Sequence, residues 1–497
     1  MRVRAVITVE DGASPLFLRI ARGIGDDVTR GRLRAGDPLP GTRALAVTLG
    51  INRNTVVAAY HELVAEGWAV ARPGGGTFVA DVPAQKPRAF ARDAGPARIA
   101  SEPAFALRSA ARDPRSPRLA PGTLVLSGGT PDVRLVDRAV LARALRHAVM
   151  ARGATDLLAY GDSRGDPRLR AALANLARDE RGVPACADNV LVVSGSQMAL
   201  ELTARAVLRS PAPSAGAIAV EAVGYRAAWS AFERAGARVV PVPVDEAGMD
   251  VDALGELTRR EPIRAVYVTP HHQCPTMATL GRGRRLALLA LARREGFAII
   301  EDDYDHELHY EGRPILPLAS ADRHGSVIYV GTLSKVLAPG LRLGYVIAPQ
   351  PVVECLARDR FLVDRQGDQI VERAAAELIE DGAVARHVRR VRRIYMARRD
   401  LLVDELERGL PGHLHARRPA GGLSLWARVR LRPSLVACWE RRALELGVAF
   451  AAGQRFMFDG SAIPFARFGF ASSNETELRE AVRRLVRAFP RGPRRGA

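Results

Sequence analysis

The sequence predicts two folded parts: a small helical unit that ends in a β-hairpin, and a large α/β domain whose mostly parallel sheet is covered by helices on both faces. Residues 1–80 combine amphipathic helical spacing with two short alternating strands. Residues 126–490 alternate apolar runs with helical stretches, which is the pattern of a parallel sheet between two helical layers. Residues 81–125 are rich in proline, alanine and arginine, and we expect them to form a semi-extended linker.

The first part is predicted to hold three helices. The first should begin at Ser14-Pro15, with serine as the cap and proline at the first helical position. A second helix is expected over 42–49, ended by Gly50, and a third from Arg53 to about residue 66. One face of the first helix is apolar at every fourth position: Leu16, Ile20, Ile24 and Val28.

Two short helices joined by a tight, glycine-containing turn have the shape of a helix-turn-helix. The third helix carries Arg53, Asn54 and Thr55 at its N-terminal end, where recognition helices meet base edges and phosphates. Residues 68–79 then alternate as two strands around a glycine-rich tip, and this hairpin would form a wing. The alternative is a small helical cap with a solvated basic face.

The combination resembles the winged helix of GntR-type regulators, with the family's pattern echoed in residues 39–46, 52–56 and 75–79. Gly41 departs from that pattern, which usually has serine or another small polar residue there. The resemblance implies a dimer that binds a double-stranded DNA operator. By the same resemblance the DNA contacts would come from Arg43, Arg53, Asn54, Thr55, Arg72 and Gly75.

The composition is that of a water-soluble globular protein, with 47% hydrophobic and 26% charged residues. No apolar run approaches a membrane-spanning length and no signal-peptide core is present, so we expect a cytoplasmic protein with no membrane partner. Its four cysteines show no metal-ligand or redox spacing, and we expect no metal site. The net charge of +19 favours a polyanionic partner, although much of that charge is spread over helices.

Seven apolar runs in the large part are predicted to be strands. Ligands in such sheets bind at the carboxyl ends of the strands, so the residues that follow these runs are the candidates for chemistry. The runs are 189–193, 217–220, 238–242, 264–268, 297–300, 326–330 and 343–347.

Lysine usage singles out one residue. Only Lys86 and Lys335 are lysines among 73 basic side chains, and all the others are arginines. Arginine cannot lose its proton in a protein, so it cannot replace an amine that attacks a carbonyl group. Lys335 follows the apolar run 326–330, where a Schiff-base lysine would be held rigidly, whereas Lys86 lies in the linker as an ordinary exposed charge. The alternative is that Lys335 survived by chance.

Two further strand ends and one arginine near Lys335 are also candidates. Residues 194–197 (Ser-Gly-Ser-Gln) lie between a strand and a helix, where backbone N–H groups can bind a phosphate, although many such turns are rich in glycine and serine. An acidic cluster at 301–304 follows another strand, where a buried carboxylate could keep a pyridinium nitrogen protonated. A metal site or a solvated turn would also explain that cluster. Arg342, seven residues after Lys335, is well placed to reach a phosphate.

Residues 331–335 with Pro339 and Arg342, residues 301–305 and residues 269–273 resemble class I aminotransferases of fold type I. More specifically, the chain is similar to the MocR/GabR family, in which such a domain follows a GntR-type winged helix. The resemblance covers about residues 14–488. It implies a three-layer αβα domain over 126–490, with a smaller C-terminal α+β subdomain at roughly 376–490, and pyridoxal 5'-phosphate (PLP) as cofactor.

By that resemblance Lys335 forms the aldimine with PLP, Asp302 pairs with the ring nitrogen, and Tyr304 contacts the ring hydroxyl. Arg467 would grip the carboxylate of an amino acid by a two-pronged contact. The remaining cofactor residues would be Tyr225 stacked on the ring, Gly195, Ser196, Gln197, Ser334 and Arg342 at the phosphate, and Tyr160 reaching the phosphate of a second subunit.

Two positions depart from the aminotransferase pattern Asn-Pro-Thr-Gly. Cys274 replaces the asparagine, as is usual in the regulator family, and removes one ring-hydroxyl contact. Met277 replaces the glycine and puts the loop shape in doubt. The arginine-dense segment 386–393 is interpreted as a solvated helix face, with a second DNA surface as the alternative.

The sequence therefore predicts a PLP-dependent DNA-binding transcriptional regulator that senses a small amino compound, or PLP, at Lys335. A working aminotransferase that carries a DNA-binding tether is the main alternative, because the residues needed for half of a transamination are all present. A PLP-free scaffold is a third reading.

Overall fold

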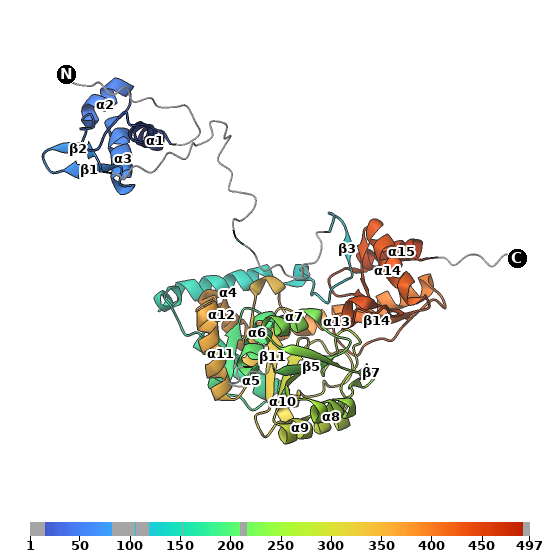
Figure 1. The fold of residues 1–497 in the computed structure, drawn as a ribbon. Coiled ribbons are helices and arrows are strands. Elements are labelled where there is room, and N and C mark those ends of the chain that lie inside the picture. Colours follow the sequence, from blue (N-terminus) through green and yellow to red (C-terminus); the bar gives the residue numbers. More distant parts are fainter. Residues whose placement is uncertain (1–14, 82–104, 106–118, 152, 209–215, 491–497) are drawn as a thin grey trace. The chain divides into compact units, whose positions relative to one another are not determined.

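The computed structural model describes residues 15–81, 105, 119–151, 153–208 and 216–490 (Figure 1). The chain divides into two compact units, Met1–Asp113 and Pro114–Ala497. Ser14, Lys86 and most of the expected linker 81–125 lie outside the described residues. None of the helices in the described part is both long and apolar enough to cross a membrane.

The first unit has the three helices and the hairpin that the sequence predicts: α1 (Leu16–Thr29), α2 (Thr42–Leu49), α3 (Arg53–Ala65), and the antiparallel pair β1 (Ala69–Arg72) and β2 (Gly76–Val79). One boundary differs. Pro15 has an extended ψ of 140° and is the N-cap of α1, so proline precedes the first helical residue instead of occupying it. Gly50 ends α2 with a φ of 65°, the left-handed conformation that glycine adopts at little cost.

A compact core fixes the position of α3 in this unit. Ile20 and Ile24 of α1 pack with Leu45 of α2 and with Val56 and Leu63 of α3, and all five side chains are buried. Burial of this many aliphatic side chains is the main source of stability for so small a unit. The side chain of Asn52 accepts a hydrogen bond from the backbone N–H of Asn54 at 2.8 Å and caps the start of α3. The N-terminal end of α3 is thereby held in a defined place.

The second unit is built on a seven-stranded sheet in the order β4-β12-β11-β10-β9-β5-β6. Six of these strands are parallel to one another, and β12 runs antiparallel to both of its neighbours. All seven predicted runs form this sheet: β4 (Val190–Val193), β5 (Ala217–Glu221), β6 (Arg238–Val242), β9 (Ile263–Val268), β10 (Ala298–Asp303), β11 (Val327–Thr332) and β12 (Gly344–Ile347).

Strand β10 is longer than the sequence indicates. The acidic residues from Glu301 to Asp303 lie within the strand, not after it. Their backbone continues to pair with β11, with Asp302 opposite Val330 and Asp303 opposite Gly331. The neighbouring strands β9 and β11 are apolar, and their pairing with β10 places these charged residues in the interior of the sheet. The residue pattern of β10 alone does not indicate this.

Helices cover both faces of the sheet, as expected for three layers (Figure 1). One face, which includes Ile300 and Val330, packs against α6 (Ser196–Leu208), α7 (Arg226–Arg234) and α11 (Gln350–Val363). The other, which includes Ile299 and Tyr329, packs against α5 (Pro167–Arg181), α8 (Val251–Arg260), α9 (Arg282–Glu295), α10 (Leu318–Ala321) and α12 (Gln369–Glu380), and α4 (Arg138–Met150) lies along α12.

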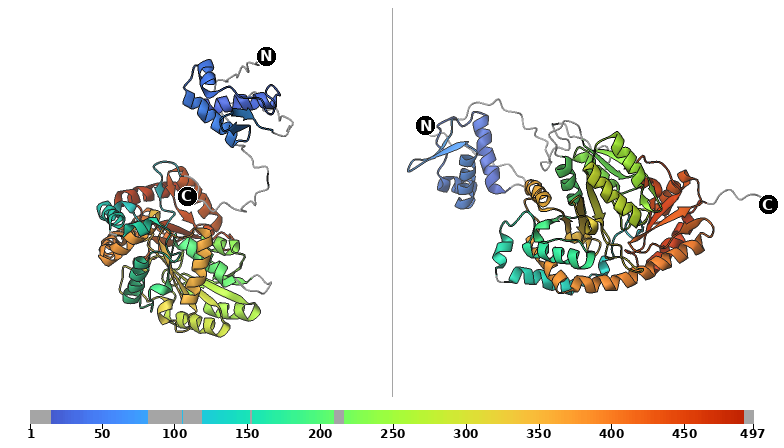
Figure 2. Two further views of the ribbon diagram at one scale, coloured as in Figure 1. Left: turned by 90° about the vertical axis from the view of Figure 1, so that its left-hand side faces the viewer. Right: turned by 90° about the horizontal axis from the view of Figure 1, so that it is seen from below.

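A second, smaller core lies towards the C-terminus. The long helix α13 (Ala383–Gly409) connects the helices beside the large sheet with a four-stranded antiparallel sheet (Figure 2). This sheet has the order β13 (Leu414–Ala416), β14 (Ser424–Val429), β17 (Phe465–Gly469) and β16 (Ala451–Ala452), and packs with α14 (Pro433–Glu445) and α15 (Glu475–Ala488). Two small pairs complete the fold, β3 (Leu124–Val125) with β15 (Val448–Ala449) and β7 (Val244–Asp245) with β8 (Gly248–Met249).

Along α13, Val384, Val388 and Val391 are buried, whereas Arg389 and Arg393 are exposed. The arginine-dense segment is therefore the solvent side of an amphipathic helix, and a second DNA surface on it stays a prediction.

Candidate functional site

The predicted cofactor residues meet at one edge of the large sheet because β4, β10 and β11 are parallel and end there. Gly195 and Ser196 follow β4, Asp302 lies near the end of β10, and Lys335 follows β11. The sheet topology therefore brings together residues that are more than 100 positions apart in the chain.

Lys335 is partly buried, and its Nζ donates a hydrogen bond to the carbonyl oxygen of Gly129 at 2.8 Å. Burial lowers the pKa of this amine, and the positive charge of Arg467 lowers it further. A lowered pKa increases the fraction of free amine, which is the form that attacks a carbonyl carbon.

Asp302 is 4% exposed and carries one strong partner. Its Oδ2 accepts a hydrogen bond from the hydroxyl of Tyr267 at 2.8 Å. Its Oδ1 is buried and has no hydrogen-bond partner among the residues that the structure describes. Burial raises the pKa of this carboxyl group to about 7. A protonated ring nitrogen facing Oδ1 would satisfy the oxygen and stabilise its negative charge, so Asp302 fits the pyridinium of PLP.

The turn after β4 has the geometry of an anion cradle. Gly195 has a φ of 89°, and a Cβ atom on it would lie 2.8 Å from Nη2 of Arg342. Nη2 of Arg342 donates to the carbonyl of Ser194 at 2.6 Å, which holds the guanidinium at the turn. A Cβ atom on Gly344 would lie 2.8 Å from the backbone nitrogen of Ser196, the first residue of α6. The glycines leave room at a helix N-terminus, where phosphate is favourably bound.

Two other predicted phosphate-binding residues differ in whether their side chains already have a hydrogen-bond partner. The hydroxyl of Ser334 is buried and without a partner within the described chain, so it is available to a phosphate. The side-chain amide of Gln197 instead donates to the carbonyl of Ala227 at 2.7 Å. Its nitrogen is therefore committed to α7.

Arg467 lies close to Lys335 through a shared neighbour. Its Nε donates to the hydroxyl of Ser424 at 3.0 Å, and its guanidinium carbon lies 5.7 Å from the ring centroid of Phe456. A Cβ atom on Gly129 would lie 2.7 Å from its Nη2, so Gly129 touches both Arg467 and Lys335. Arg467 forms no ion pair with any residue that the structure describes, which leaves its charge for a ligand.

The three predicted tyrosines are placed differently. The hydroxyl of Tyr304 donates to the carbonyl of His272 at 2.9 Å. Tyr225 immediately precedes α7 and is 39% exposed as a residue. Tyr160 is 77% exposed and stacks with Arg365, whose guanidinium carbon is 3.9 Å from the ring centroid. Tyr160 is thus a surface residue of its own subunit.

The loop with the two departures keeps a glycine-like shape. Met277 has a φ of 62°, the left-handed region that glycine favours, and its N–H donates to the carbonyl of Gln273 at 2.7 Å. Cys274 is buried, and burial raises the pKa of its thiol to about 11, so it is a neutral thiol. Its backbone N–H donates to the hydroxyl of Thr269 at 3.0 Å.

Sequence reasoning missed several members of the site. Tyr267, Gly129 and Gly344 contact Asp302, Lys335 and the phosphate turn, but each acts through a neighbour set by strand order. The one available signal was the tyrosine inside the apolar run 264–268, because a buried tyrosine hydroxyl usually has a partner.

In the first unit, Arg43, Arg53, Asn54, Arg72 and Gly75 are exposed. Thr55 is half-buried. Within the described part of the chain none of these three arginines forms an ion pair, although Nε of Arg53 lies 3.4 Å from the hydroxyl of Thr42 and Arg72 lies over the ring of Phe78. Unneutralised arginines at the start of a helix and on a wing suit contact with DNA phosphates and bases.

Comparison with known proteins agrees with both parts. Residues 16–79 match the family "Bacterial regulatory proteins, gntR family", and residues 123–485 match "Aminotransferase class I and II". The chain is 33% identical over 481 residues to the probable rhizopine catabolism regulatory protein MocR of Rhizobium meliloti, covering 96% of this chain and 94% of that protein. It is 34% identical to the HTH-type transcriptional regulator TauR of Rhodobacter capsulatus, covering 98% and 99% of the two chains.

Among solved structures, the α-aminoadipate aminotransferase LysN of Thermus thermophilus, complexed with N-(5'-phosphopyridoxyl)-L-leucine, is similar with a TM-score of 0.68 and 30% identity. That similarity covers 74% of this chain and 92% of LysN. Its ligand contains the phosphopyridoxyl group for which Asp302, the anion cradle and Lys335 are suited. The chain belongs to the MocR-type transcriptional regulators, in which a GntR DNA-binding domain precedes a PLP-dependent domain of aminotransferase class I and II.

Proposed function

We propose that this regulator senses a small amino compound, or PLP itself, at Lys335 and Arg467. The observation that carries the proposal is that both side chains contact Gly129, so one ligand with an amine and a carboxylate could engage both. PLP, when bound, supplies an aldehyde carbon to which amines add. Asp302 would hold the ring nitrogen, and Ser196, Ser334 and Arg342 the phosphate.

Each residue then has a defined task. The lowered pKa of Lys335 keeps part of the amine neutral and able to exchange with an incoming amine. Arg467 would orient the carboxylate by two parallel N–H···O contacts. Such binding changes DNA affinity only if the ligand binds two conformations of the protein unequally.

A spectral titration of the PLP-loaded protein tests this. We expect α-amino acids to change the cofactor's absorbance. In Arg467→Ala the affinity for α-amino acids should fall at least about tenfold, whereas the response to simple amines should remain. If no amino compound, and no excess PLP, alters either the spectrum or the DNA affinity, the sensing proposal is wrong.

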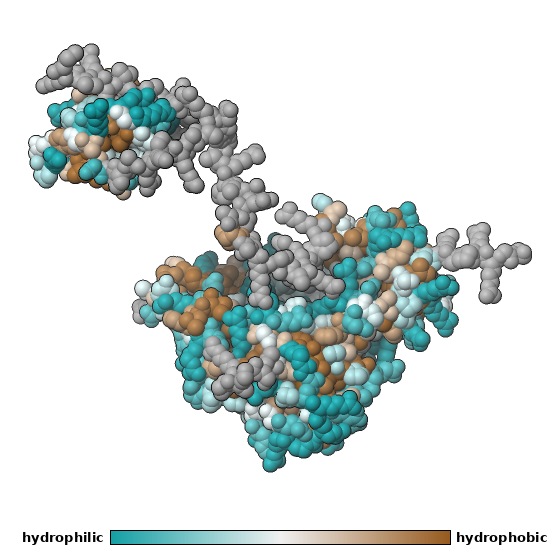
Figure 3. All heavy atoms as spheres, in the orientation of Figure 1, coloured by the Kyte–Doolittle hydropathy of each residue, from teal (hydrophilic) through white to brown (hydrophobic). Residues whose placement is uncertain are grey.

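We also propose that the protein is a homodimer with Tyr160 of the partner subunit at the phosphate. Large hydrophobic side chains are exposed at the end of α4, around Tyr160 and at the end of α11, and Figure 3 shows hydrophobic surface where α4 and α12 meet. Exposed patches of this kind mark interaction sites. The exposed residues include Val149, Met150, Leu158, Phe361, Leu362 and Val363. Light scattering should give twice the monomer mass, and Leu362→Asp should halve it.

The winged helix is proposed to bind a double-stranded operator through Arg43, Arg53, Asn54, Thr55, Arg72 and Gly75. Arg53→Ala should weaken operator binding by about tenfold or more while PLP stays bound, because one base or phosphate contact is lost. Fluorescence anisotropy with a labelled operator measures this. Unchanged affinity would remove Arg53 from the interface.

A second function, a working aminotransferase, is favoured by the same gathering of Lys335, Asp302 and Arg467. Purified protein given amino donors and keto acids distinguishes the two. Sustained product formation at ordinary enzyme rates would replace the sensor with an enzyme, whereas a single half-reaction is compatible with sensing.

A further inference from the structure

Four of the chain's ten histidines gather beside the cofactor site, and none of them has a part in PLP binding as described above. His271 and His272 follow β9, and His306 and His309 follow β10. Because β9 and β10 are parallel neighbours, their two following loops meet at the same edge of the sheet. The ring centroids of His271 and His272 are 4.3 Å apart, and those of His271 and His306 are 4.9 Å apart.

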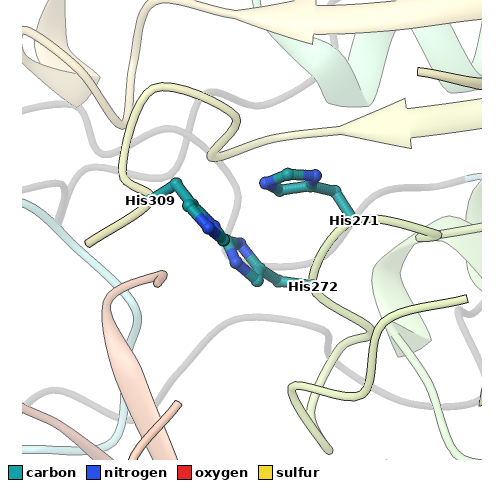
Figure 4. A group of neighbouring side chains, drawn as sticks. All are labelled: His271, His272 and His309. Carbon is teal, nitrogen blue, oxygen red and sulfur yellow. The ribbon is translucent and has the colours of Figure 1, made fainter. Parts of the chain in front are cut away.

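Three of these rings turn towards one another (Figure 4). His271, His272 and His309 each offer one ligand nitrogen, and these three atoms all lie within 4.8 Å of one another. His271 and His272 are 5% and 2% exposed, so water does not easily satisfy their nitrogens. Buried ring nitrogens without a hydrogen-bond partner in the described chain are Nε2 of His271, Nε2 of His272 and Nδ1 of His309. Both ring nitrogens of His306 likewise have no partner at hydrogen-bond geometry. An unpaired buried polar atom is unfavourable unless something completes it.

Carboxylates orient the rings from behind. Nδ1 of His272 lies 2.8 Å from Oδ1 of Asp305, and Nδ1 of His306 lies 2.9 Å from Oδ2 of Asp303. A hydrogen bond at Nδ1 fixes the tautomer of His272 and leaves Nε2 with a free lone pair. Carboxylate–histidine pairs of this kind support metal ligands. Gly421 keeps the space beside that lone pair open, since a Cβ atom there would lie 2.6 Å from Nε2.

We propose that His271, His272 and His309 bind a divalent transition-metal ion of the zinc class through their unpaired ring nitrogens. Imidazole is a preferred ligand for zinc, and three histidines with one open position are an established zinc geometry. Tetrahedral bonds of about 2.0–2.1 Å place ligand nitrogens about 3.3 Å apart, so the ligand nitrogens must approach one another by at most about 1.5 Å from their present positions. His309 is half-buried on a loop and can supply much of that movement by side-chain rotation.

The expectation of no metal site rested on cysteine spacing and did not consider these histidines. A packed cluster of histidines that binds no metal is the competing explanation. It predicts that the protein takes up no metal and that no single histidine matters for zinc affinity.

The test uses the full-length, untagged, PLP-loaded protein, because a polyhistidine tag would itself bind zinc. Zinc chloride is titrated in competition with a chromophoric chelator, and cobalt chloride serves as a second probe through its visible absorption bands. We expect one zinc ion per chain and cobalt bands typical of tetrahedral coordination. His309→Ala and His271→Asn should each lower zinc affinity about 100-fold or more, and Asp305→Asn about 10- to 100-fold.

His415→Ala is the matched control, since its side chain is 83% exposed and it lies on β13, outside the cluster. It should bind zinc as the wild type does. An unchanged PLP spectrum in each variant shows that the protein is folded, and it separates the metal site from the cofactor site. Absence of zinc uptake by the wild type, or equal uptake by wild type, His309→Ala and His271→Asn, would overturn the proposal.

Discussion

Two neighbouring aspartates on opposite faces of β10 have opposite pKa shifts. Asp302 and Asp303 follow one another in the strand, are 4% and 3% exposed, and point to opposite faces of the sheet. Burial raises the pKa of Asp302 to about 7. Burial alone would also raise the pKa of Asp303, but the nearby His306 outweighs it and holds that pKa well below its usual range.

The two pKa values differ because positively charged side chains surround Asp303 more closely than Asp302. Oδ2 of Asp303 is close to His306 at 2.9 Å and accepts a hydrogen bond from Tyr329 at 2.9 Å, and Tyr329 is in turn bonded to the buried Arg181. Among the described residues, Asp302 forms no ion pair and accepts its hydrogen bond from the neutral hydroxyl of Tyr267, and the charge of Lys335 offsets only part of the burial that raises its pKa. Asp303 is therefore paired with described residues of the protein, whereas Oδ1 of Asp302 has no partner among them, which supports the proposed pairing of Asp302 with the PLP ring nitrogen. A buried acid that lacks a cation is a sign of a ligand site.

Lys335→Arg should have the largest effect on the cofactor side. It keeps the charge but removes the only kind of nitrogen that can bond covalently to the PLP aldehyde, so we expect complete loss of the cofactor's visible absorbance and of borohydride-trapped adduct. Lys86→Arg, at the chain's other lysine, is the matched control and should keep both. Retained colour in Lys335→Arg would refute the assigned role.

Asp303→Asn should cause the largest loss of stability on the Asp303 face of β10. Removing the charge leaves His306 and the buried arginine network without their partner, and breaking such a buried set costs about 3–5 kcal/mol of unfolding free energy. Urea denaturation of the PLP-free protein at neutral pH measures this. A loss below about 1 kcal/mol would show that the network is not what stabilises that face.

Asp302→Asn should instead make the PLP-free protein more stable than the wild type at neutral pH. Because the folded-state pKa of Asp302 is raised, its contribution to stability is fully present below its unfolded pKa of about 3.9 and is lost as the pH rises through about 7. Between pH 5 and pH 8 the PLP-free wild type should lose about 2–3 kcal/mol that the asparagine variant keeps. The same variant should bind PLP more weakly.

Parallel pH series of urea denaturation check this, with Asp303→Asn as the comparison. A pH-independent difference between the wild type and Asp302→Asn would contradict the raised pKa of Asp302.

Met277→Gly should have the smallest effect. Relief of the positive φ at a non-glycine residue is worth about 1 kcal/mol, so the variant should be slightly more stable with an unchanged PLP spectrum. Met277→Ala keeps the strained backbone and removes the same side chain, and it should not gain stability. If both variants change alike, side-chain packing rather than backbone strain governs this loop.

Much of the fold could be predicted from sequence because its signals are local. Apolar runs gave all seven strands of the main sheet, and glycine with helical spacing gave the three helices of the winged unit. The inward extension of β10 could not be predicted, since Glu301 to Asp303 look like a polar loop until their strand neighbours are known. The antiparallel direction of β12 depends on tertiary packing in the same way.

The residues of the candidate site also fall into two groups: those that local sequence indicates and those that depend on tertiary contacts. Lys335, Asp302 and Arg467 carry chemistry that a sequence shows. Tyr267 needs the order of β9 and β10, and Gly129 needs a contact that spans 206 positions of the chain. The histidine cluster joins two loops that only the sheet brings together.

Gly129 belongs to a short stretch that begins with β3, the first strand of the second unit in the described chain. In this stretch Leu126 accepts a hydrogen bond from the N–H of Gly469 at 2.6 Å, and Gly129 accepts one from Lys335. A ligand that engages Lys335 and Arg467 together would withdraw both of them from Gly129. The freed carbonyl of Gly129 would then need another hydrogen-bond donor, or the backbone around it would have to move. A ligand in the pocket would therefore act directly on the main chain that follows β3.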